Sequence, residues 1–399
     1  MDGFAFVPES ALQIGGRAVP ADVKSAIMSI TSKTGLDGVD QAVIVLANDM
    51  LQWLDNDLFR VGKELSLDLG TADHGLKRVF TGEIVAKAAK FTAETGNTLI
   101  VTAQDRRHNM ADGTKTRWFA IPVPATGNFP FPDPATASLA TLENFMLPII
   151  DPVGAAIAVV LGGLDVAAVF SDPAAGQKLI RKQGDESDLD FLKRIAKENQ
   201  WDMLVEHDRV DGHVLRFQSS IDHLSSEADF EFGLDVLEFE SRITKVGQID
   251  AVSIAVWVPK IKMTFTITLG WDWDQPALTL DIVPGVIPIG AGGKGKLKID
   301  EPASPFSAGR KLLSELIPRL NRRMTAMLKI PGHVGLKAGR TINMSGVGKE
   351  FGGLYRITGL THKLDGTGFT TMAELRKEIW FGSVPGYENG TSPVRPAAI

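Results

Sequence analysis

The pattern of apolar and polar residues along the chain is mainly that of β-strands. Residues 24–46 form two apolar runs around a turn rich in Gly and Asp, and residues 59–69 alternate apolar with polar side chains. Residues 79–89 and 98–104 are separated by a Glu-Thr-Gly-Asn turn and predict a β-hairpin. We therefore predict a mainly β first domain over residues 1–120.

A small α+β module is predicted over residues 177–235. In the sequence GDESDLDFLKRIAKENQW, Ser187 is expected to cap a helix that has acidic residues in its first turn and apolar residues on one face. The apolar runs that follow flank a turn ending in Asp-Gly, which indicates a hairpin.

A second mainly β domain is predicted over residues 236–382. A helix over 307–328 is expected to interrupt it, because apolar residues recur there at helical spacing, and Pro318 is expected to kink this helix. Two segments lie outside these domains. Residues 121–176 form a Pro-rich arm followed by an apolar stretch, and residues 383–399 form a polar tail that we expect to be flexible.

An internal repeat relates the two predicted β domains. The matched segments, in chain order, are 29–45 with 242–256, 61–67 with 338–344, 80–84 with 355–357, and 94–98 with 365–369. We interpret them as two copies of one β domain, the second interrupted by the segment that holds the predicted helix. The alternative is that any two strand–turn–strand segments share Gly and Val at similar places.

Composition excludes several classes of function. The chain has 399 residues, with 42 Lys+Arg against 48 Asp+Glu and a net charge of −6, which argues against a dedicated nucleic-acid-binding protein. Apolar residues make up 44%, which is too many for a disordered chain. The absence of cysteine excludes disulfides, cysteine-ligated zinc, iron–sulfur clusters and thiol nucleophiles.

Known catalytic motifs are mostly missing. Residues 290–295 satisfy the GxGxxG pattern, but they follow a Pro-rich stretch and lead into no helix, so a flexible loop is favoured over a dinucleotide site. Asp272 and Asp274 are carboxylic acids, as the acid pair of a glycosidase requires. The favoured interpretation is instead that both are solvated acids at the exposed end of a strand.

The histidines give no metal site by spacing. His207 and His213 flank the predicted hairpin turn, and no set of acidic partners converges on them in the sequence. His362 falls within a predicted strand and is interpreted as a residue of its polar face. We therefore predict no catalytic, cofactor-binding or metal-ligating residues, no cofactor and no enzymatic activity.

Targeting and membrane signals are also weak. Residues 1–16 lack the basic region, apolar run and cleavage site of a secretory signal, so synthesis in the cytoplasm is expected. The stretch 146–170 is apolar except for Asp151 and Asp165, between which lie only 13 residues. A membrane span needs about 20 apolar residues, so we expect this stretch to be buried or packed on a partner.

Two longer sequence segments resemble a known family. The sequence GDESDLDFLKRIAKENQWDMLVEHDRVDGHVLRF resembles the helix-plus-hairpin module of the phage late control protein D family, the baseplate hub of contractile tails, which shares this part with VgrG-like spike proteins. The sequence GLKAGRTINMSGVGKEFGGLYRITGLTHKLDGTGFTTMAELRK is similar to the last barrel of that family. The two segments together cover about 80 residues.

The resemblance implies a fold that is mainly β with α+β insertions. It would have two tube-like β-barrel domains, 1–120 and 236–382, related by internal duplication, plus the helix–hairpin module. It also implies a structural hub without catalytic residues, a homotrimer that adapts the sixfold inner tube to the threefold spike. The expected partners are the inner tube protein, a spike protein and other baseplate proteins, with no specific nucleic acid and no membrane.

This sequence departs from the family in two places. Residues 121–176 replace a shorter connection, and no spike domain follows the second β domain, so we expect the spike to be a separate chain. A phage tail and an extracellular or cell-anchored injection particle both remain open. The alternatives to a hub are another β-rich binding or adhesin protein and a cell-wall or glycan-active enzyme.

Overall fold

The computed structural model describes the chain as two compact units. The described residues are 7–36, 38–72, 75–94, 96–120, 180–198, 201–209, 212–219, 223–244, 251–258, 262–272, 277–285, 296–303 and 305–378. The first unit comprises Met1–Met110, Asp202–Ile243 and Met324–Pro385. The second comprises Ala111–Trp201, Thr244–Arg323 and Gly386–Ile399. The predicted arm and apolar stretch at 121–176 and the tail at 383–399 lie outside the described residues.

The first half of the first unit is almost entirely β. Its elements are β1 (Pro8–Ile14), β2 (Arg17–Ala18), α1 (Ala21–Ala26), β3 (Ile27–Gly35), β4 (Gln41–Ala47), the short 3-10 helix η1 (Asp57–Phe59), β5 (Glu64–Thr71), β6 (Gly75–Lys90), β7 (Thr98–Gln104) and α2 (Arg107–Met110). Alternate residues of a strand point to opposite faces, so Ala42, Ile44 and Leu46 of β4 all face the core, together with Leu67 and Phe80.

The second half has its own hydrophobic core. Its elements are β12 (Ala228–Glu231), β13 (Glu238–Ile243), β18 (Met324–Pro331), β19 (Thr341–Ser345), α9 (Gly348–Phe351), β20 (Gly353–Asp365) and β21 (Gly368–Arg376). Leu328, Ile342, Tyr355, Ile357 and Leu375 are buried together in this core.

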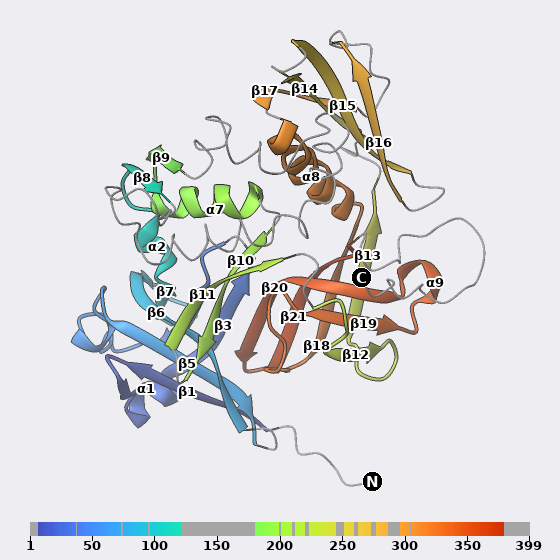
Figure 1. The fold of residues 1–399 in the computed structure, drawn as a ribbon. Coiled ribbons are helices and arrows are strands. Elements are labelled where there is room, and N and C mark those ends of the chain that lie inside the picture. The colour runs from blue at the N-terminus through green and yellow to red at the C-terminus, as the bar shows by residue number, and fades with distance from the viewer. Residues whose placement is uncertain are drawn as a thin grey trace. The chain divides into compact units, whose positions relative to one another are not determined.

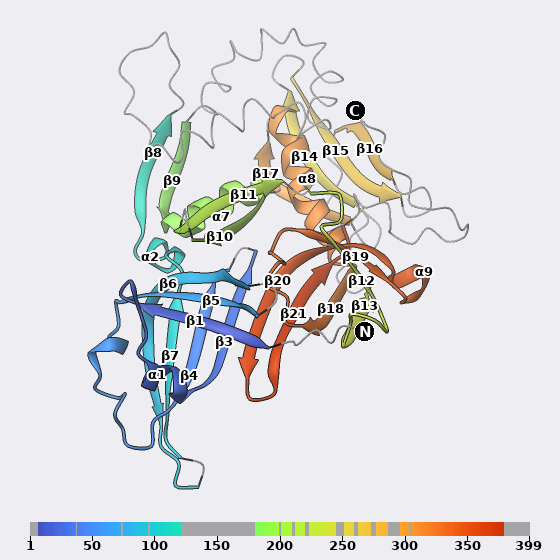
Figure 2. The ribbon, with the colours of Figure 1, turned by 90° about the horizontal axis from the view of Figure 1, so that it is seen from below.

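One sheet joins the two halves. It has 13 strands in the order β13-β18-β21-β20-β3-β4-β7-β6-β5-β1-β2, and β19 pairs with both β20 and β12 beside this path. The joining pair is antiparallel, with Gly359 of β20 opposite Gly35 of β3 and Asp365 opposite Ser29 (Figure 2). The two halves, each with its own core, are therefore parts of one continuous hydrogen-bonded sheet.

The strand order confirms the internal duplication. The first half runs β3-β4-β7-β6-β5 across the sheet, and the second half runs β13-β18-β21-β20-β19. Numbered along the chain, both are first, second, fifth, fourth and third, and every pair within them is antiparallel. A shared order of five strands is far more specific than shared Gly and Val residues, so chance resemblance no longer explains the repeat.

The backbone repeats in detail as well. Gly62 has a φ of +93° and donates to the Ile84 carbonyl at 2.8 Å, and Gly339 has a φ of +82° and donates to the Ile357 carbonyl at 2.8 Å. The register shifts directly after Ile84 and Ile357 in the two corresponding hairpins. These positions confirm the matches predicted between 61–67 and 338–344 and between 80–84 and 355–357.

One part of the predicted repeat is wrong. Residues 252–256 lie in β14 (Ala251–Val258), which belongs to the second unit and pairs with β15 and β17. The true counterpart of β4 is β18, which follows a long insertion after β13. The error arose because β14 has the same apolar alternation as β4, and sequence pattern alone does not say which strand a segment pairs with.

The helix predicted over 307–328 also ends too late. The observed helix α8 spans Pro305–Asn321, and Pro318 lies inside it. Met324 and Leu328 belong to β18, where buried and exposed residues alternate and both edges are hydrogen-bonded to β13 and β21. Apolar residues at 324, 327 and 328 continue a helical spacing by coincidence, and strand pairing overrides it.

The helix and the hairpin predicted after residue 177 both form. Helix α7 spans Asp188–Glu198, and its cap is the predicted one, because Ser187 Oγ accepts from the Asp190 N–H at 3.0 Å and donates to the Asp190 carboxylate at 2.7 Å. Strands β10 (Trp201–Asp208) and β11 (Gly212–Ser219) form a separate two-stranded sheet. The predicted domain boundaries stay predictions.

The second unit contains a smaller sheet and the longer helices. Its other elements are β8 (Lys115–Ala120), β9 (Ile180–Glu186), β15 (Met263–Asp272), β16 (Ala277–Pro284) and β17 (Lys296–Ala303). The sheet order is β16-β15-β14-β17, and α8 packs on β14 and β15. Leu312 and Leu316 of the helix and Ile254 and Ile267 of the strands are all buried. No helix within the described residues is long and apolar enough to cross a bilayer. The predicted mainly β fold class with helical insertions is confirmed.

Candidate functional site

The β10–β11 hairpin contacts both halves of the first unit (Figure 1). His207 of β10 bonds to Asp40, which precedes β4 in the first half, at 2.9 Å. Asp202 of the same strand bonds to Arg376 of β21 in the second half at 2.8 Å. A single short hairpin therefore ties together the two copies of the repeat, and we call it the bridging hairpin.

A buried cluster of charged residues anchors the bridging hairpin to the first half. Asp40 Oδ1 accepts from the Gly35 N–H at 3.0 Å and lies 2.8 Å from Arg107 Nη2. Asp105 accepts from Arg107 Nε and Nη2, and it also accepts the Asp40 backbone N–H at 2.6 Å. Asp40, Asp105 and Arg107 are all nearly inaccessible to solvent.

The two carboxylates of this cluster keep the Arg107 guanidinium charged. Burial alone would lower the pKa of the Arg107 guanidinium, but the hydrogen bonds and charges of Asp105 and Asp40 raise its pKa above the usual value. His207 Nδ1 accepts the Thr81 N–H at 3.0 Å, so the ring proton must lie on Nε2, which donates to Asp40. Both imidazole nitrogens are thereby occupied.

A second buried cluster anchors the hairpin to the other half. Arg376 donates to both carboxylate oxygens of Asp202 and to Glu378. Arg356 Nε lies 2.9 Å from Glu378 Oε2, and both side chains are fully buried. Burial opposes the charge on Arg376, yet the two carboxylates raise its pKa above the usual value. Gln218 of β11 completes the contact by donating to the Gly339 carbonyl at 2.6 Å.

Several strand edges of the sheet have no strand partner among the described residues, and two of them, on β13 and on the outer part of β6, lie at related places in the repeat. Strand β13 pairs only with β18. Strand β6 pairs with β5 through Glu83 and with β7 beyond that point, so its outer part has one bare edge, and residues 86–90 there are exposed. Unpaired edges are sites where another strand can add.

Solved structures of phage tail proteins share this architecture. The 43 kDa tail protein of prophage MuSo2 from Shewanella oneidensis matches with a TM-score of 0.57 at 13% identity, over 92% of this chain and 98% of that protein. The tail protein from Neisseria meningitidis MC58 matches with a TM-score of 0.58 at 10% identity, over 95% and 99%. No protein-family model and no curated protein sequence matches the chain.

This chain has the fold of a phage tail protein. A further match is the E. coli c3393 protein, a component of the type VI secretion system with structural similarity to the T4 tail proteins gp27 and gp5. Its TM-score is 0.50 at 11% identity, over 91% of this chain and 76% of that protein. The resemblance to a baseplate hub, inferred from two sequence segments, is thus confirmed at the level of the fold.

The tail-protein fold scatters the residues considered for chemistry. His207 and His213 lie on β10 and β11 and flank the hairpin turn as predicted, and His207 is held in the buried cluster. Asp272 ends β15 of the other unit. Asp274 and the glycine-rich residues 290–295 lie outside the described residues. No group of three or more His, Asp or Glu side chains in the described part of the chain is placed to hold a metal ion.

His362 differs from its predicted place on a polar face. It is buried in β20 between β3 and β21, and its Nδ1 lies 2.9 Å from Thr371 Oγ1. The pKa of His362 is lowered to about 4, first by burial and then by the charge of His333. A histidine next to threonines and serines in a strand has no sequence signal that distinguishes it from an exposed one.

Sequence reasoning missed every charged residue of the two buried clusters. The missed residues are Asp40, Asp105, Arg107, Asp202, Arg356, Arg376 and Glu378. The sequence carries no signal for them: Arg356 stands between Tyr355 and Ile357, so strand alternation would place it on a solvated face, yet all three residues are buried. The two clusters hold the bridging hairpin against both halves of the first unit.

Proposed function

We propose that this chain is the structural hub of a baseplate, in a phage tail or an injection particle. Three copies would close a ring of six β halves that adapts a sixfold inner tube to a threefold spike carried by a separate chain. The observation that carries this proposal is the presence of two β halves with the same five-strand order in one chain. The tail-protein fold supports the setting of the proposal in a tail or secretion particle.

The proposed contact between neighbouring copies repeats the β3–β20 pairing found within one copy. Inside the chain, β3 of the first half pairs with residues 359–365 of β20 in the second half. The counterpart of β3 is β13, and the counterpart of residues 359–365 is the segment 86–92, which begins on the exposed edge of β6. The unpaired edges of β13 and of the outer part of β6 are therefore the two that the repeat would bring together between neighbouring copies.

The side chains on these edges are complementary. Carrying over the β3–β20 register places Lys90 opposite Glu240, and Phe91 opposite Phe239. Opposite charges and aromatic pairs directly across a sheet stabilise it by roughly 0.2–1 kcal/mol each.

In the proposed ring, the neighbouring copy would cover the exposed aromatic residue Phe91. Phe91 is 62% exposed, although its counterpart Leu364 packs against the core of the first half. In a neighbouring copy, Phe91 would lie over the core of the second half beside Phe239 in the same way. A head-to-tail contact of this kind closes into a ring when the rotation per copy fits, which also removes the bare edges.

Charge exchange across the proposed contact tests the ring. Lys90→Glu and Glu240→Lys should each weaken assembly, and the double variant Lys90→Glu/Glu240→Lys should restore it, as read by native mass spectrometry of the full chain. Lys24→Glu on α1 makes the same charge change away from both edges and should leave assembly unchanged. A wild-type chain that assembles as a dimer or a hexamer, or that stays monomeric at high concentration, would contradict the hub proposal.

We also propose that the hub role involves no catalysis. Purified wild-type chain is expected to release no product from peptidoglycan or soluble glycans. Hydrolysis that disappears in Asp272→Asn would overturn this part and would favour a glycan-active enzyme.

A further inference from the structure

A cavity of about 520 Å³ lies on the first unit beside β12. Residues of both halves line this cavity. The first half contributes Gly70, Thr71 and Lys77 from β5 and β6. The second half contributes Ala228, Asp229, Phe230, Leu234 and Asp235 from β12 and the loop that follows, and residues 330–335 from the end of β18 onward. Its volume is within the range of about 300–1,000 Å³ found for ligand sites. Neither the buried charge clusters nor the proposed contact between copies uses it.

The cavity runs along the edge of β12. Successive residues of a strand point to opposite faces, yet Ala228, Asp229 and Phe230 all line the cavity. Because the cavity reaches three consecutive residues, we place it beside the strand and not above one of its faces. The other edge of β12 is occupied by β19, whose residues do not line the cavity, so the cavity follows the edge that has no strand partner among the described residues.

In the first half of the unit, the strand at the position of β12 is paired with a further strand. There, β5 pairs with β1, and β1 in turn pairs with β2. In the second half, β19 pairs with β12, and no described strand follows. The outer edge of β12 therefore has no described strand beside it, whereas the outer edge of β1 is paired with β2 at Gln13 and Ile14.

The lining of the cavity specifies the chemistry of an occupant. Phe230, Ile330 and Val334 supply an apolar surface, and Leu234 adds to it from the loop although 77% of that residue is exposed. Two acidic residues, Asp229 and Asp235, line the same cavity. Asp229 Oδ1 accepts from Ser226 Oγ at 2.9 Å, which holds this carboxylate in place. Lys77 is the one basic lining residue apart from His333, so acidic groups prevail.

We propose that an extended segment of a partner protein adds to β12 as a further strand and inserts a Lys or Arg side chain between Asp229 and Asp235. The residues before and after that basic residue are apolar. This follows from strand alternation, because Ala228 and Phe230 lie on the opposite face of β12 from Asp229, where they pack on the core of the second half. Main-chain hydrogen bonds to β12 supply affinity, and the acid–base contact selects the sequence.

Labelled pentapeptides test the recognition. The probe is fluorescein-labelled Thr-Val-Lys-Val-Thr, titrated with the full chain and followed by fluorescence anisotropy, and the matched probe is Thr-Val-Glu-Val-Thr. The Lys peptide should bind at least tenfold more tightly than the Glu peptide, and added salt should weaken it. The variant Asp229→Asn/Asp235→Asn should lose at least tenfold in affinity for the Lys peptide, whereas Asp281→Asn on β16 should not.

Hydrogen exchange tests the added strand separately. Saturating Lys peptide should slow amide exchange in residues 227–232, and a peptide with N-methylated backbone amides should not. The proposal is wrong if the Lys peptide fails to bind below 1 mM, if both peptides bind equally, or if the Asp variant binds as well as wild type. A tenfold gain in peptide affinity on deleting residues 1–6 would instead assign the groove to this chain's own N-terminal segment, since the Val7 carbonyl bonds to the Ala72 N–H beside the cavity. None of these outcomes depends on ring formation.

Discussion

Acidification should weaken the junction between the two β halves through His362. This side chain is 3% exposed and lies on β20, directly opposite Ser32 of β3 and Thr371 of β21. A positive charge there would lie in the middle of the strand pair that joins the halves. The pKa of His362 is lowered to about 4, chiefly because burial disfavours the charged ring.

The size and sign of the effect follow from the two pKa values. In the unfolded chain the ring titrates near 6.5, so between pH 6.5 and pH 4 the unfolded state binds a proton that the folded state does not. The contribution of His362 to folding is therefore fully present above pH 6.5 and is lost as the pH falls toward 4. A difference of about 2.5 pKa units corresponds to about 3 kcal/mol, which is a large share of a typical unfolding free energy of about 5–15 kcal/mol.

Urea unfolding at pH 7, 6, 5 and 4, followed by circular dichroism, measures this contribution. The free energy of unfolding of wild type minus that of His362→Gln should fall by about 3 kcal/mol from pH 7 to pH 4, because glutamine does not titrate. His333→Gln should keep most of this pH dependence, since burial outranks the His333 charge among the causes. A wild-type and a His362→Gln curve that stay parallel to within about 0.5 kcal/mol would refute the reasoning.

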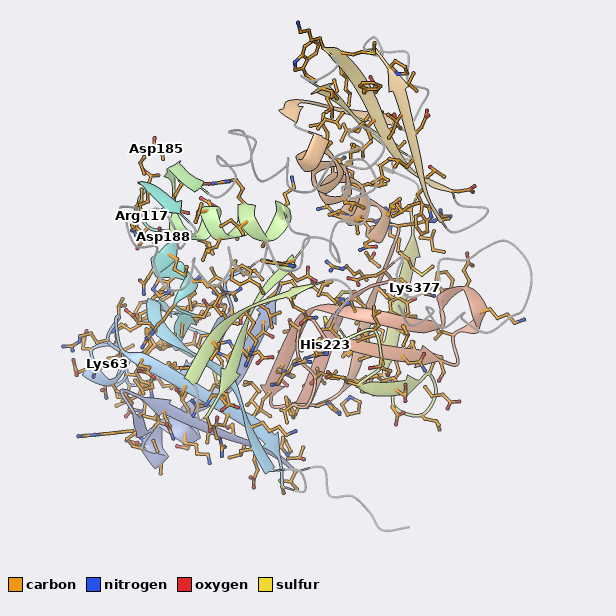
Figure 3. All side chains as sticks on the ribbon, viewed as in Figure 1. Lys63, Arg117, Asp185, Asp188, His223 and Lys377 are labelled. Carbon is orange, nitrogen blue, oxygen red and sulfur yellow. The ribbon has the colours of Figure 1, made fainter. Side chains whose placement is uncertain are left out.

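Three further variants test other features of the first unit. Asp40→Ala removes the buried carboxylate that bonds to the Gly35 N–H, Arg107 and His207, and it should cost about 3–5 kcal/mol in urea unfolding. Burial lowers the pKa of Lys377 (Figure 3) to about 8, so the unfolded chain binds the extra proton between pH 8 and 10.5, and wild type should gain stability over Lys377→Met as the pH rises through that window. Gly339→Ala combines a φ of +82° with a Cβ only 2.8 Å from a side-chain oxygen, so its melting temperature should fall more than that of Gly15→Ala, which has a φ of +60° and open space.

The sequence predicts local features of this fold well. The cap at Ser187 depends on one side chain and the three residues after it, and it forms as expected. The glycines at 62 and 339 mark the same left-handed backbone position in both copies of the repeat, which made the match of those segments reliable. Such features are decided within a few residues, where side-chain chemistry and backbone geometry act directly.

Features that depend on pairing between distant segments were missed. Asp40 and His207 are 167 residues apart, and Asp202 and Arg376 are 174 apart, so no spacing rule connects them. The predicted repeat matched β14, instead of β18, to β4 for the same reason, because the pairing of distant segments cannot be read from the sequence. Apolar alternation says that a strand is half buried but does not say which neighbour covers it.

The pairing of β3 with β20 has a consequence for synthesis on the ribosome. The β20 residues that pair with β3 leave the ribosome about 320 residues after β3 itself. At about 5–20 residues per second, the edge of β3 waits roughly 16 to 65 s for its partner. During that time the first half can complete its own core, yet it presents an open strand edge to other nascent chains. A fragment that ends before β20 should therefore be prone to aggregate, and production of this chain should benefit from slower initiation or from holdase chaperones.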